Sequence, residues 1–222
     1  IVIHQQYLGG GYGRRLFGDQ MIPAVLAARE LGRPLKLIFD READSRFDCV
    51  RSPTVCTFAA SFDQQGALSG IDHAAVAGWP TLSMAPGFMA PGVAGLGKFD
   101  PFSISGAEHW YSVPAHRIRA INNELAQKTF LPGWLRAVGS GWTGWGVESF
   151  MDEIAHELSE DPLALRLRLL DGAGKNAGGE GSTIGGAARL RSVLEDVAIR
   201  SNWGTELPAA EGMGVAVCHG QE

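Results

Sequence analysis

The chain has 222 residues, 45% of them hydrophobic and 19% charged, and its mean hydropathy is near zero. This composition is typical of a globular chain large enough to bury a core, and it excludes intrinsic disorder and fibrous repeats. The 24 acidic and 19 basic residues give a net charge of −5, and no apolar run reaches the roughly 18 residues of a membrane-spanning helix, so neither nucleic-acid binding nor a transmembrane segment is expected.

Glycine is the most overrepresented residue, at 30 of 222, about twice its usual ~7%. Residues 1–3 and residues 214–218 are both strand-like, and no initiating Met, signal peptide or helix cap precedes the first stretch. We therefore expect an internal segment of a longer polypeptide. The alternative is a naturally short chain with processed ends.

The N-terminal forty residues predict a strand, a glycine loop, a helix and a second strand. Residues 1–7 are strand-like, and residues 9–13 are mostly Gly. Apolar residues then recur at helical spacing over 17–28, and Gly32 ends the helix. Residues 35–39 predict the second strand.

The middle of the chain predicts a β-hairpin and a long irregular segment. Residues 54–62 and 67–77 are β-like runs, joined by a four-residue turn at 63–66 that ends in Gly. Residues 78–106, rich in Pro, Gly, Ser and Met, have no stable period and predict a long loop. Residues 116–130 alternate loosely and predict one or two further strands.

Three helices are predicted in the last third of the chain. From Val147, apolar residues recur at i+3, i+4, i+7, i+8 and i+11, which indicates an amphipathic helix. Asp161 and Pro162 are a typical N-cap and first residue for a second helix, which runs to residue 170. A low-complexity stretch at 172–186 precedes the third helix. The predicted buried face of that helix consists of Leu190, Val193, Leu194, Val197 and Ala198.

This order of strands and helices predicts an α+β fold with mixed sheets and flanking helices, because the strands and helices do not alternate regularly.

The glycine loop at residues 9–13 precedes Arg14 and Arg15 and offers backbone amides with few side chains in the way, which suits an anion. It is not a dinucleotide-binding fingerprint, because Arg14 occupies the position of the third Gly. It is not an ATPase phosphate loop either, because Asp19 and Gln20 replace the required Lys and Ser or Thr. Taken alone, such a run indicates a glycine-rich turn.

A second distinctive segment begins at Arg136 and places small residues directly before the predicted acidic helix. Four motifs occur in one order along nearly the whole chain: GGGYGRR at 9–15, FDRE at 39–42, WLRAVGSGW at 134–142, and VESFMDEIAHELSEDPLALRLRLL at 147–170. With these motifs the chain resembles the large, molybdopterin-binding subunit of the molybdenum hydroxylases, the xanthine dehydrogenase and aldehyde oxidase superfamily. Within it, the chain is most similar to isoquinoline 1-oxidoreductase β subunits and to the large subunits of some membrane-associated aldehyde dehydrogenases.

The resemblance implies two cofactor-contacting segments, in which Tyr12 and Gly13 lie beside the ligands of the molybdenum and Arg136 lies near the active site. The implied cofactor-binding residues are Gly10, Gly11, Tyr12, Gly13, Arg136, Ala137, Val138 and Gly139. Other members have Gly-Phe-Gly or Ala-Pro-Gly after the Arg, which leaves the contact of Val138 open. In the family a glutamate near the C-terminus of the subunit acts as base, and no motif here matches it. We therefore assign no catalytic base and no metal ligand in this chain.

The implied reaction is the hydroxylation of an aldehyde or an N-heteroaromatic carbon with oxygen from water. The implied cofactor is molybdopterin with molybdenum, in the cytosine dinucleotide form common in bacterial members. The [2Fe–2S] clusters are expected on a separate small subunit, which agrees with the three cysteines of this chain. A cytochrome c subunit is a further implied partner, and the periplasm is favoured over the cytoplasm.

In this interpretation, residues 1–130 form a first molybdopterin-binding lobe with the glycine loop and the hairpin. Residues 131–222 form a second lobe segment with three helices, truncated at its C-terminus. A competing hypothesis is a non-catalytic anion- or nucleotide-binding module that uses the glycine loop without a metal. A third is a truncated gene product that does not fold, which predicts exposed hydrophobic surface and dye binding.

Several charged side chains have both a structural and a functional interpretation. Arg14 and Arg15 suit a cofactor phosphate or acidic neighbours equally well. For Glu148 and Asp152, one turn apart, a solvated acidic face is favoured over a carboxylate pair with one raised pKa.

The remaining candidates favour structural roles. Glu153 and His156 have the spacing of a di-iron ligand pair, but such sites need two copies, so a surface pair is favoured. The other histidines have no ligand spacing, and Cys49 and Cys56 are expected to be unpaired buried thiols. Core packing is favoured over substrate stacking for the aromatic residues Trp134, Trp142, Trp145 and Phe150.

Overall fold

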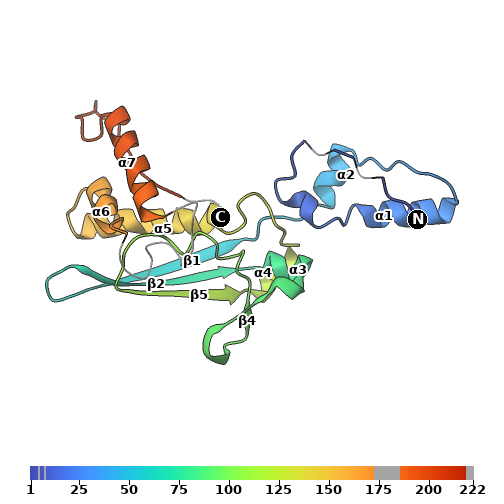
Figure 1. Cartoon of the computed structure of the whole chain (residues 1–222), viewed down its shortest axis with the longest axis horizontal. Helices are drawn as coiled ribbons and strands as arrows, with labels where there is room; N and C mark the ends of the chain where they lie inside the picture. The colour runs from blue at the N-terminus through green and yellow to red at the C-terminus, as the bar shows by residue number, and fades with distance from the viewer. Residues whose placement is uncertain (5, 8, 173–185, 219–222) are drawn as a thin grey trace.

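The computed structural model describes residues 1–4, 6–7, 9–172 and 186–218. Its helices and strands are η1 (Arg14–Leu16), α1 (Met21–Leu31), α2 (Arg41–Arg46), β1 (Thr54–Phe62), β2 (Leu68–Ala77), α3 (Pro80–Met84), η2 (Pro86–Phe88), β3 (Ala90–Pro91), η3 (Val93–Gly95), β4 (Lys98–Phe99), β5 (Ala115–Asn122), α4 (Glu124–Thr129), α5 (Ser140–Glu157), α6 (Pro162–Leu169) and α7 (Ala187–Ser201). The predicted α+β class is confirmed, with helices α5, α6 and α7 gathered on one side of the main sheet (Figure 1).

The main sheet has three strands in the order β1-β2-β5. Strands β1 and β2 pair antiparallel from Thr54 opposite Ala77 to Phe62 opposite Leu68, which confirms the predicted hairpin. Its turn uses Gly66 at φ 80°, a left-handed conformation that glycine adopts at low cost. Strand β5 pairs parallel to β2 on the other side.

The core lies between this sheet and the helices. Helix α5 crosses β1, and Val147, Met151 and Ile154 on its inner face are buried. Helix α6 begins where predicted, because the Asp161 carboxylate accepts hydrogen bonds from the amides of Leu163 and Ala164, both at 2.9 Å. A buried set on β2, α6 and α7 completes the core: Leu68, Ile71, Leu163, Leu165, Leu169 and Leu194.

Three predictions in this part need correction. Helix α5 begins at Ser140, about two turns before Val147, because small residues can be helical without contributing to an apolar stripe. Residues 116–130 form one strand and then α4, which starts because the Asn123 side chain accepts from the amide of Ala126 at 2.9 Å. The irregular stretch at 78–106 contains the short elements α3, η2, β3, η3 and β4.

On α7, Leu194 is buried as predicted and Leu190 is partly buried, but Val193 and Val197 are half exposed. The helix contacts α6 and presents only part of the predicted apolar face to the core. Of the low-complexity stretch predicted at 172–186, residues 173–185 lie outside the described residues.

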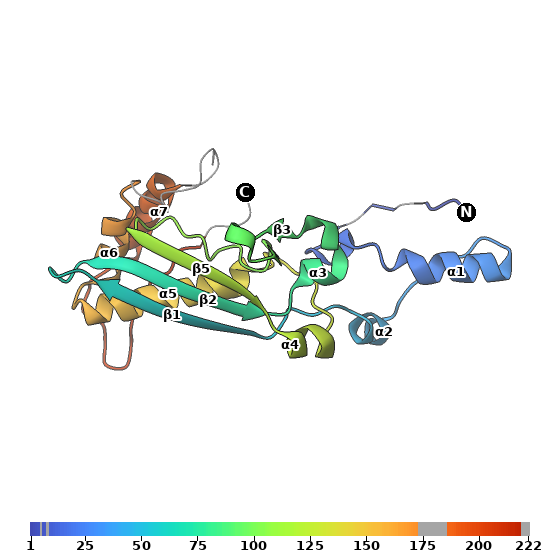
Figure 2. The same ribbon diagram turned by 90° about the horizontal axis from the view of Figure 1, so that it is seen from below.

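The N-terminal part, with α1 and α2, projects away from the sheet in both views (Figures 1 and 2). Helix α1 is confirmed, with Gly32 as its left-handed C-cap. The strands predicted at 1–7 and 35–39 do not form, because a strand needs a paired neighbour and these segments have none within the ranges that the structure describes. The strand-like residues 214–218 likewise form no ladder with another described residue.

Candidate functional site

The glycine loop makes a tight reversal just before η1. Tyr12 and Gly13 both have positive φ, at 49° and 87°, and Gly13 is the N-cap of η1. The Tyr12 ring lies over Gly10, where a Cβ atom would be 2.8 Å from Cε2 of the ring. Gly13 thus suits a left-handed backbone, and the ring of Tyr12 fills the space that a Cβ atom on Gly10 would occupy.

The loop is held against the segment at 134–136. A Cβ atom on Gly13 would overlap the carbonyl oxygen of Trp134 and lie 2.8 Å from its carbonyl carbon. The amide of Arg136 donates to the carbonyl oxygen of Tyr12 at 2.7 Å. The guanidinium carbon of Arg136 lies 5.7 Å from the centre of the Tyr12 ring, a cation–π distance. The structure thus brings together the two segments that the sequence singled out.

The backbone at 137–139 is strained. Ala137 and Val138 have φ values of 63° and 36°, and positive φ is rare for a β-branched residue such as Val138. Gly139 donates to the carbonyl oxygen of Phe102 at 3.0 Å, and a Cβ atom on Gly139 would be 2.7 Å from the carbonyl oxygens of Phe102 and Ser103. The small residues are required here by contact with residues 102–103.

Arg51, just before β1, binds three carbonyl oxygens of this segment. Its guanidinium donates to Arg136 O at 2.7 Å, to Leu135 O at 3.3 Å and to Val138 O at a short distance. The backbone beside Arg51 is anchored, because Val50 donates to Leu131 O at 2.9 Å and accepts from Gly133 N at 3.0 Å. Sequence reasoning missed Arg51, since nothing in its local pattern indicates partners more than 80 positions away.

Asp100 binds residues that contact the Arg136 segment. Its buried carboxylate accepts from Thr81 N at 2.7 Å and from Thr81 Oγ1 at 2.6 Å, and also from the amides of Phe102 and Ser103. Trp134 Nε1 donates to Thr81 Oγ1 at 3.1 Å, which joins this network to the Arg136 segment. Asp100 was also missed, because it lies inside the stretch that predicted only a loop.

Several donors at this junction are available to a ligand. Among the described residues, the amides of Gly10, Gly11, Tyr12, Gly13 and Ala137 have no hydrogen-bond partner within the protein. With the exposed guanidinium of Arg136, they form a surface rich in donors and low in side-chain bulk. Such a surface suits a planar ligand with anionic or carbonyl oxygens, and a molybdopterin is a ligand of this kind. The residues present therefore fit the group that the resemblance implies.

Arg14 faces the protein and not this surface. It donates bidentately to Asp19, at 2.6 and 3.1 Å, and through Nε to Asp48 at a short distance. These bonds raise the pKa of Arg14, and its hydrogen bonds hold the pKa of Asp19 below its usual value. Of the two interpretations weighed for Arg14, the structure selects acidic neighbours.

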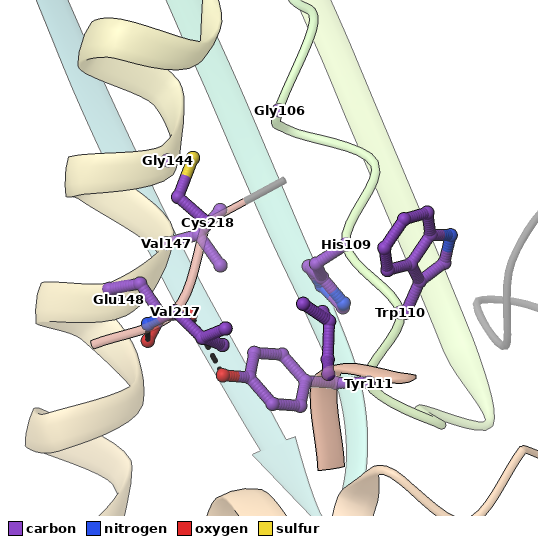
Figure 3. Close-up of a pocket in the computed structure, with 10 residues that line it drawn as sticks. Gly106, His109, Trp110, Tyr111, Gly144, Val147, Glu148, Val217 and Cys218 are labelled. Carbon is purple, nitrogen blue, oxygen red and sulfur yellow. Dashed lines mark hydrogen bonds between the residues drawn. The ribbon is translucent and has the colours of Figure 1, made fainter. Parts of the chain in front are cut away.

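A second polar cluster lies further along α5, where Glu148 is buried against expectation (Figure 3). Its Oε1 accepts from the Tyr111 hydroxyl at 2.8 Å, and its Oε2 accepts from Arg166 Nε at 2.9 Å and Val217 N at 3.0 Å. The predicted solvated acidic face is wrong for Glu148, because Arg166 is fully buried and needs this carboxylate. Asp152, by contrast, is half exposed and also accepts from Arg166, at 2.7 Å.

The cavity beside this cluster has a free volume of about 20 Å³, space for a single water molecule. Both oxygens of Glu148 already accept hydrogen bonds. Burial and the charge of Glu148 raise the pKa of Tyr111 above its usual value, so its hydroxyl stays protonated. The cluster therefore holds helices together and is not suited to take a proton from a substrate.

The structure places several of the histidines and cysteines that the sequence analysis considered. Glu153 and His156 are exposed, and no group of three metal-binding side chains occurs within the ranges that the structure describes. Cys49 and Cys56 are free thiols, and burial raises the pKa of each to about 11. His73 departs from an ordinary polar role, since it is fully buried and stacks on Phe58 at 4.1 Å.

The tryptophans divide between packing and exposure. Trp134 contacts Phe102 edge to face at 5.8 Å, and Trp142 packs on a small cluster around Ile104. Trp145 is 72% exposed, so the packing prediction is wrong for this residue, which lies on the outer side of α5.

No helix in the described part of the chain is long and apolar enough to cross a bilayer.

Comparison with known proteins places the chain in a family. A family model described as the molybdopterin cofactor-binding domain matches residues 1–170, well over half of the chain. The chain belongs to this family. The resemblance to the molybdenum hydroxylases is thereby confirmed.

Two curated relatives of this molybdopterin-binding chain are similar in sequence. It is 49% identical over its whole length to a protein of Gluconacetobacter polyoxogenes named membrane-bound aldehyde dehydrogenase [pyrroloquinoline-quinone], of which it covers 29%. It is 26% identical over 88% of its length to isoquinoline 1-oxidoreductase subunit beta of Brevundimonas diminuta, of which it covers 23%. The chain thus spans less than a third of the length of these relatives.

Solved structures show the same fold. The aldehyde oxidoreductase from Desulfovibrio gigas matches 88% of the chain with a TM-score of 0.62 at 19% identity, and the chain covers 20% of it. Quinoline 2-oxidoreductase from Pseudomonas putida 86 matches 88% of the chain with a TM-score of 0.56 at 18% identity, and the chain covers 25% of it.

Proposed function

We propose that this chain forms one wall of the cofactor site in a molybdenum-dependent oxidoreductase that hydroxylates an aldehyde or an N-heteroaromatic carbon with oxygen from water. The observation that carries the proposal is the junction of Tyr12 with Arg136, where a backbone hydrogen bond of 2.7 Å joins two donor-rich segments. The names of the relatives, an aldehyde dehydrogenase and an isoquinoline oxidoreductase subunit, support the same substrate classes.

In this proposal, the residues of the chain bind and orient the cofactor. The amides of the glycine loop and of Ala137 donate to its oxygens, and the Arg136 guanidinium adds a fixed positive charge at the same surface. When bound, a molybdopterin supplies the two-electron redox centre. The Tyr12 ring, exposed beside Arg136, forms an apolar side of the site that suits a planar or carbonyl substrate. The base is contributed from outside this chain.

Metal and cofactor analysis of the purified full-length protein tests the proposal. We expect about one molybdenum and one pterin per chain. Because one relative carries pyrroloquinoline quinone in its name, the quinone is measured in the same sample, and we expect none. Anion or nucleotide binding with no molybdenum would instead support the non-catalytic binding module.

Gly13→Val in the full-length protein gives a finer test. A side chain at Gly13 collides with the backbone of Trp134, so we expect loss of molybdenum. Gly66→Val is the matched control, because Gly66 has a similar φ of 80° but open space around it. Retained molybdenum and unchanged activity in Gly13→Val would count against the assignment of the glycine loop.

The finer features of the enzyme follow the family resemblance and the relatives' names. We propose the cytosine dinucleotide form of the cofactor, which acid hydrolysis would reveal as released CMP. The name "subunit beta" of one relative supports a multi-subunit enzyme. We propose an iron–sulfur small subunit and a cytochrome c as partners, to be found by co-purification. A periplasmic location is proposed and is tested by cell fractionation.

A further inference from the structure

The guanidinium of Arg51 donates to three backbone carbonyl oxygens of the Arg136 segment, here residues 135–139. We propose that Arg51 is a positioning residue for the cofactor site: it turns the peptide groups at 135–139 so that the amide of Ala137 points into the site. This inference rests on the proposed function for the identity of the ligand, but the geometry of Arg51 is independent of it.

The carbonyl groups of the Arg136 segment converge on Arg51. The oxygens of Leu135, Arg136 and Val138 all accept from one guanidinium. Consecutive carbonyls in an extended chain point to alternate sides, so this convergence requires an unusual backbone. Ala137 and Val138 supply it through their positive φ values.

The amides of the same peptide groups point away from Arg51. In a planar trans peptide group the N–H points away from the C=O. Two of the three groups have visible partners on the far side, since Arg136 N donates to Tyr12 O at 2.7 Å and Gly139 N donates to Phe102 O at 3.0 Å. The third, between Arg136 and Ala137, must follow the same rule. Its N–H points away from Arg51 and has no partner among the described residues.

Arg51 itself is held in place by its neighbours. Beside Arg51, Val50 is bonded to Leu131 and Gly133. The planar fork of Arg51 also packs under Gly141, where a Cβ atom would be 3.0 Å from the guanidinium. A lysine ammonium at the same place is a point charge and cannot reproduce the fork toward three carbonyls.

The test uses the full-length holoenzyme with Arg51→Lys and Arg51→Ala. Arg168→Ala is the control, because Arg168 on α6 pairs with Glu160, which precedes that helix. Removing groups that orient metal-site ligands typically costs about 10- to 100-fold in affinity or activity. We expect a loss of kcat/KM of that size and reduced molybdenum content for both Arg51 variants, and neither for Arg168→Ala.

Two further measurements separate positioning from general stability. Amide hydrogen exchange should accelerate at residues 135–139 in the Arg51 variants, while the buried turn of α5 at 151–155 should exchange as in the parent protein. Ethylguanidinium at low millimolar concentration should restore activity and molybdenum content to Arg51→Ala, whereas ethylammonium should not.

Unchanged exchange at 135–139 in both variants would overturn the inference. So would a loss of molybdenum that comes with faster exchange in α5 and is not rescued by ethylguanidinium, because this pattern indicates general destabilisation. A parent protein without molybdenum would reject the proposed function, and exchange at 135–139 would then still decide whether Arg51 holds the segment.

Discussion

Arg166 is fully buried on α6 and donates through Nε to Oε2 of Glu148 on α5 at 2.9 Å. Its other nitrogens donate to Glu148 O, Pro162 O and Asp152, so every part of the guanidinium is bonded. Burial opposes its charged form most strongly, but the interactions with Glu148, Tyr111 and Asp152 together outweigh burial and raise the pKa of Arg166. The pair joins two helices and, through Val217 and Tyr111, two further segments of the chain (Figure 3).

Arg166→Met should therefore be strongly destabilising. It leaves the Glu148 carboxylate buried without its charge partner, and breaking a buried pair in this way costs about 3–5 kcal/mol. Arg200→Met, which removes an exposed pair with Asp196, should cost no more than about 1 kcal/mol. Thermal or urea unfolding of the full-length variants measures both. Equal stability of the two variants would show that the Glu148 pair contributes nothing beyond a surface bridge.

How far the sequence predicts the structure depends on how local the determining contacts are. The hairpin at Gly66 and the start of α6 at Asp161 were predicted, because turn and capping residues act on their immediate neighbours. Asn123 carried the same kind of capping signal for α4, and it could have been found. The burial of Glu148 could not, because its partner Arg166 comes 18 positions later on another helix.

The candidate site shows the same limit. The sequence identified Tyr12 and Arg136 through the family resemblance, and the structure brings them together. Arg51 and Asp100 carry no motif, because an arginine before a strand and an aspartate in a loop are common. Only the folded chain shows that both support the backbone beside Arg136.

The stability of the protein should depend on His73 at mildly acidic pH. Burial lowers the pKa of His73 from 6.5 to about 4, and the nearby His116 adds to this effect. Between these values the unfolded chain binds a proton on this ring and the folded chain does not. The stability contributed by the neutral ring is therefore complete above pH 6.5 and is lost as the pH falls toward 4.

His73→Phe, which keeps an aromatic ring next to Phe58, should flatten this part of the stability profile. The measurement is the melting temperature at several pH values between 7 and 4.5. His156→Gln is the control, because His156 is exposed on α5 and its removal should leave the slope unchanged. A His73→Phe profile as steep as that of the parent protein would place the pH dependence elsewhere.

Gly139 should be intolerant of even one methyl group. Its φ of −72° suits any residue, so Gly139→Ala tests the contact with Phe102 and Ser103 without a backbone penalty. Overpacking of this kind costs about 1–3 kcal/mol, and here it also pushes the Arg136 segment away from residues 102–103. We expect lower stability and reduced molybdenum content. Gly87→Ala, which meets open space, should change neither.

Asp100→Asn should weaken the contacts that hold the Arg136 segment. One carboxylate oxygen accepts from Thr81 N and the other accepts from Thr81 Oγ1 and the amide of Phe102, whereas an asparagine keeps only one acceptor oxygen and so loses at least one of these bonds. A buried donor left without its acceptor costs about 1–3 kcal/mol. Trp134 Nε1 donates to Thr81 Oγ1, so the indole of Trp134 should also gain mobility. A lower fluorescence anisotropy would detect this in a protein whose only fluorescent label is at Trp134. Asp196→Asn on the surface of α7 is the control, and an anisotropy equal to that of this control would mean that Asp100 does not hold Trp134 in place.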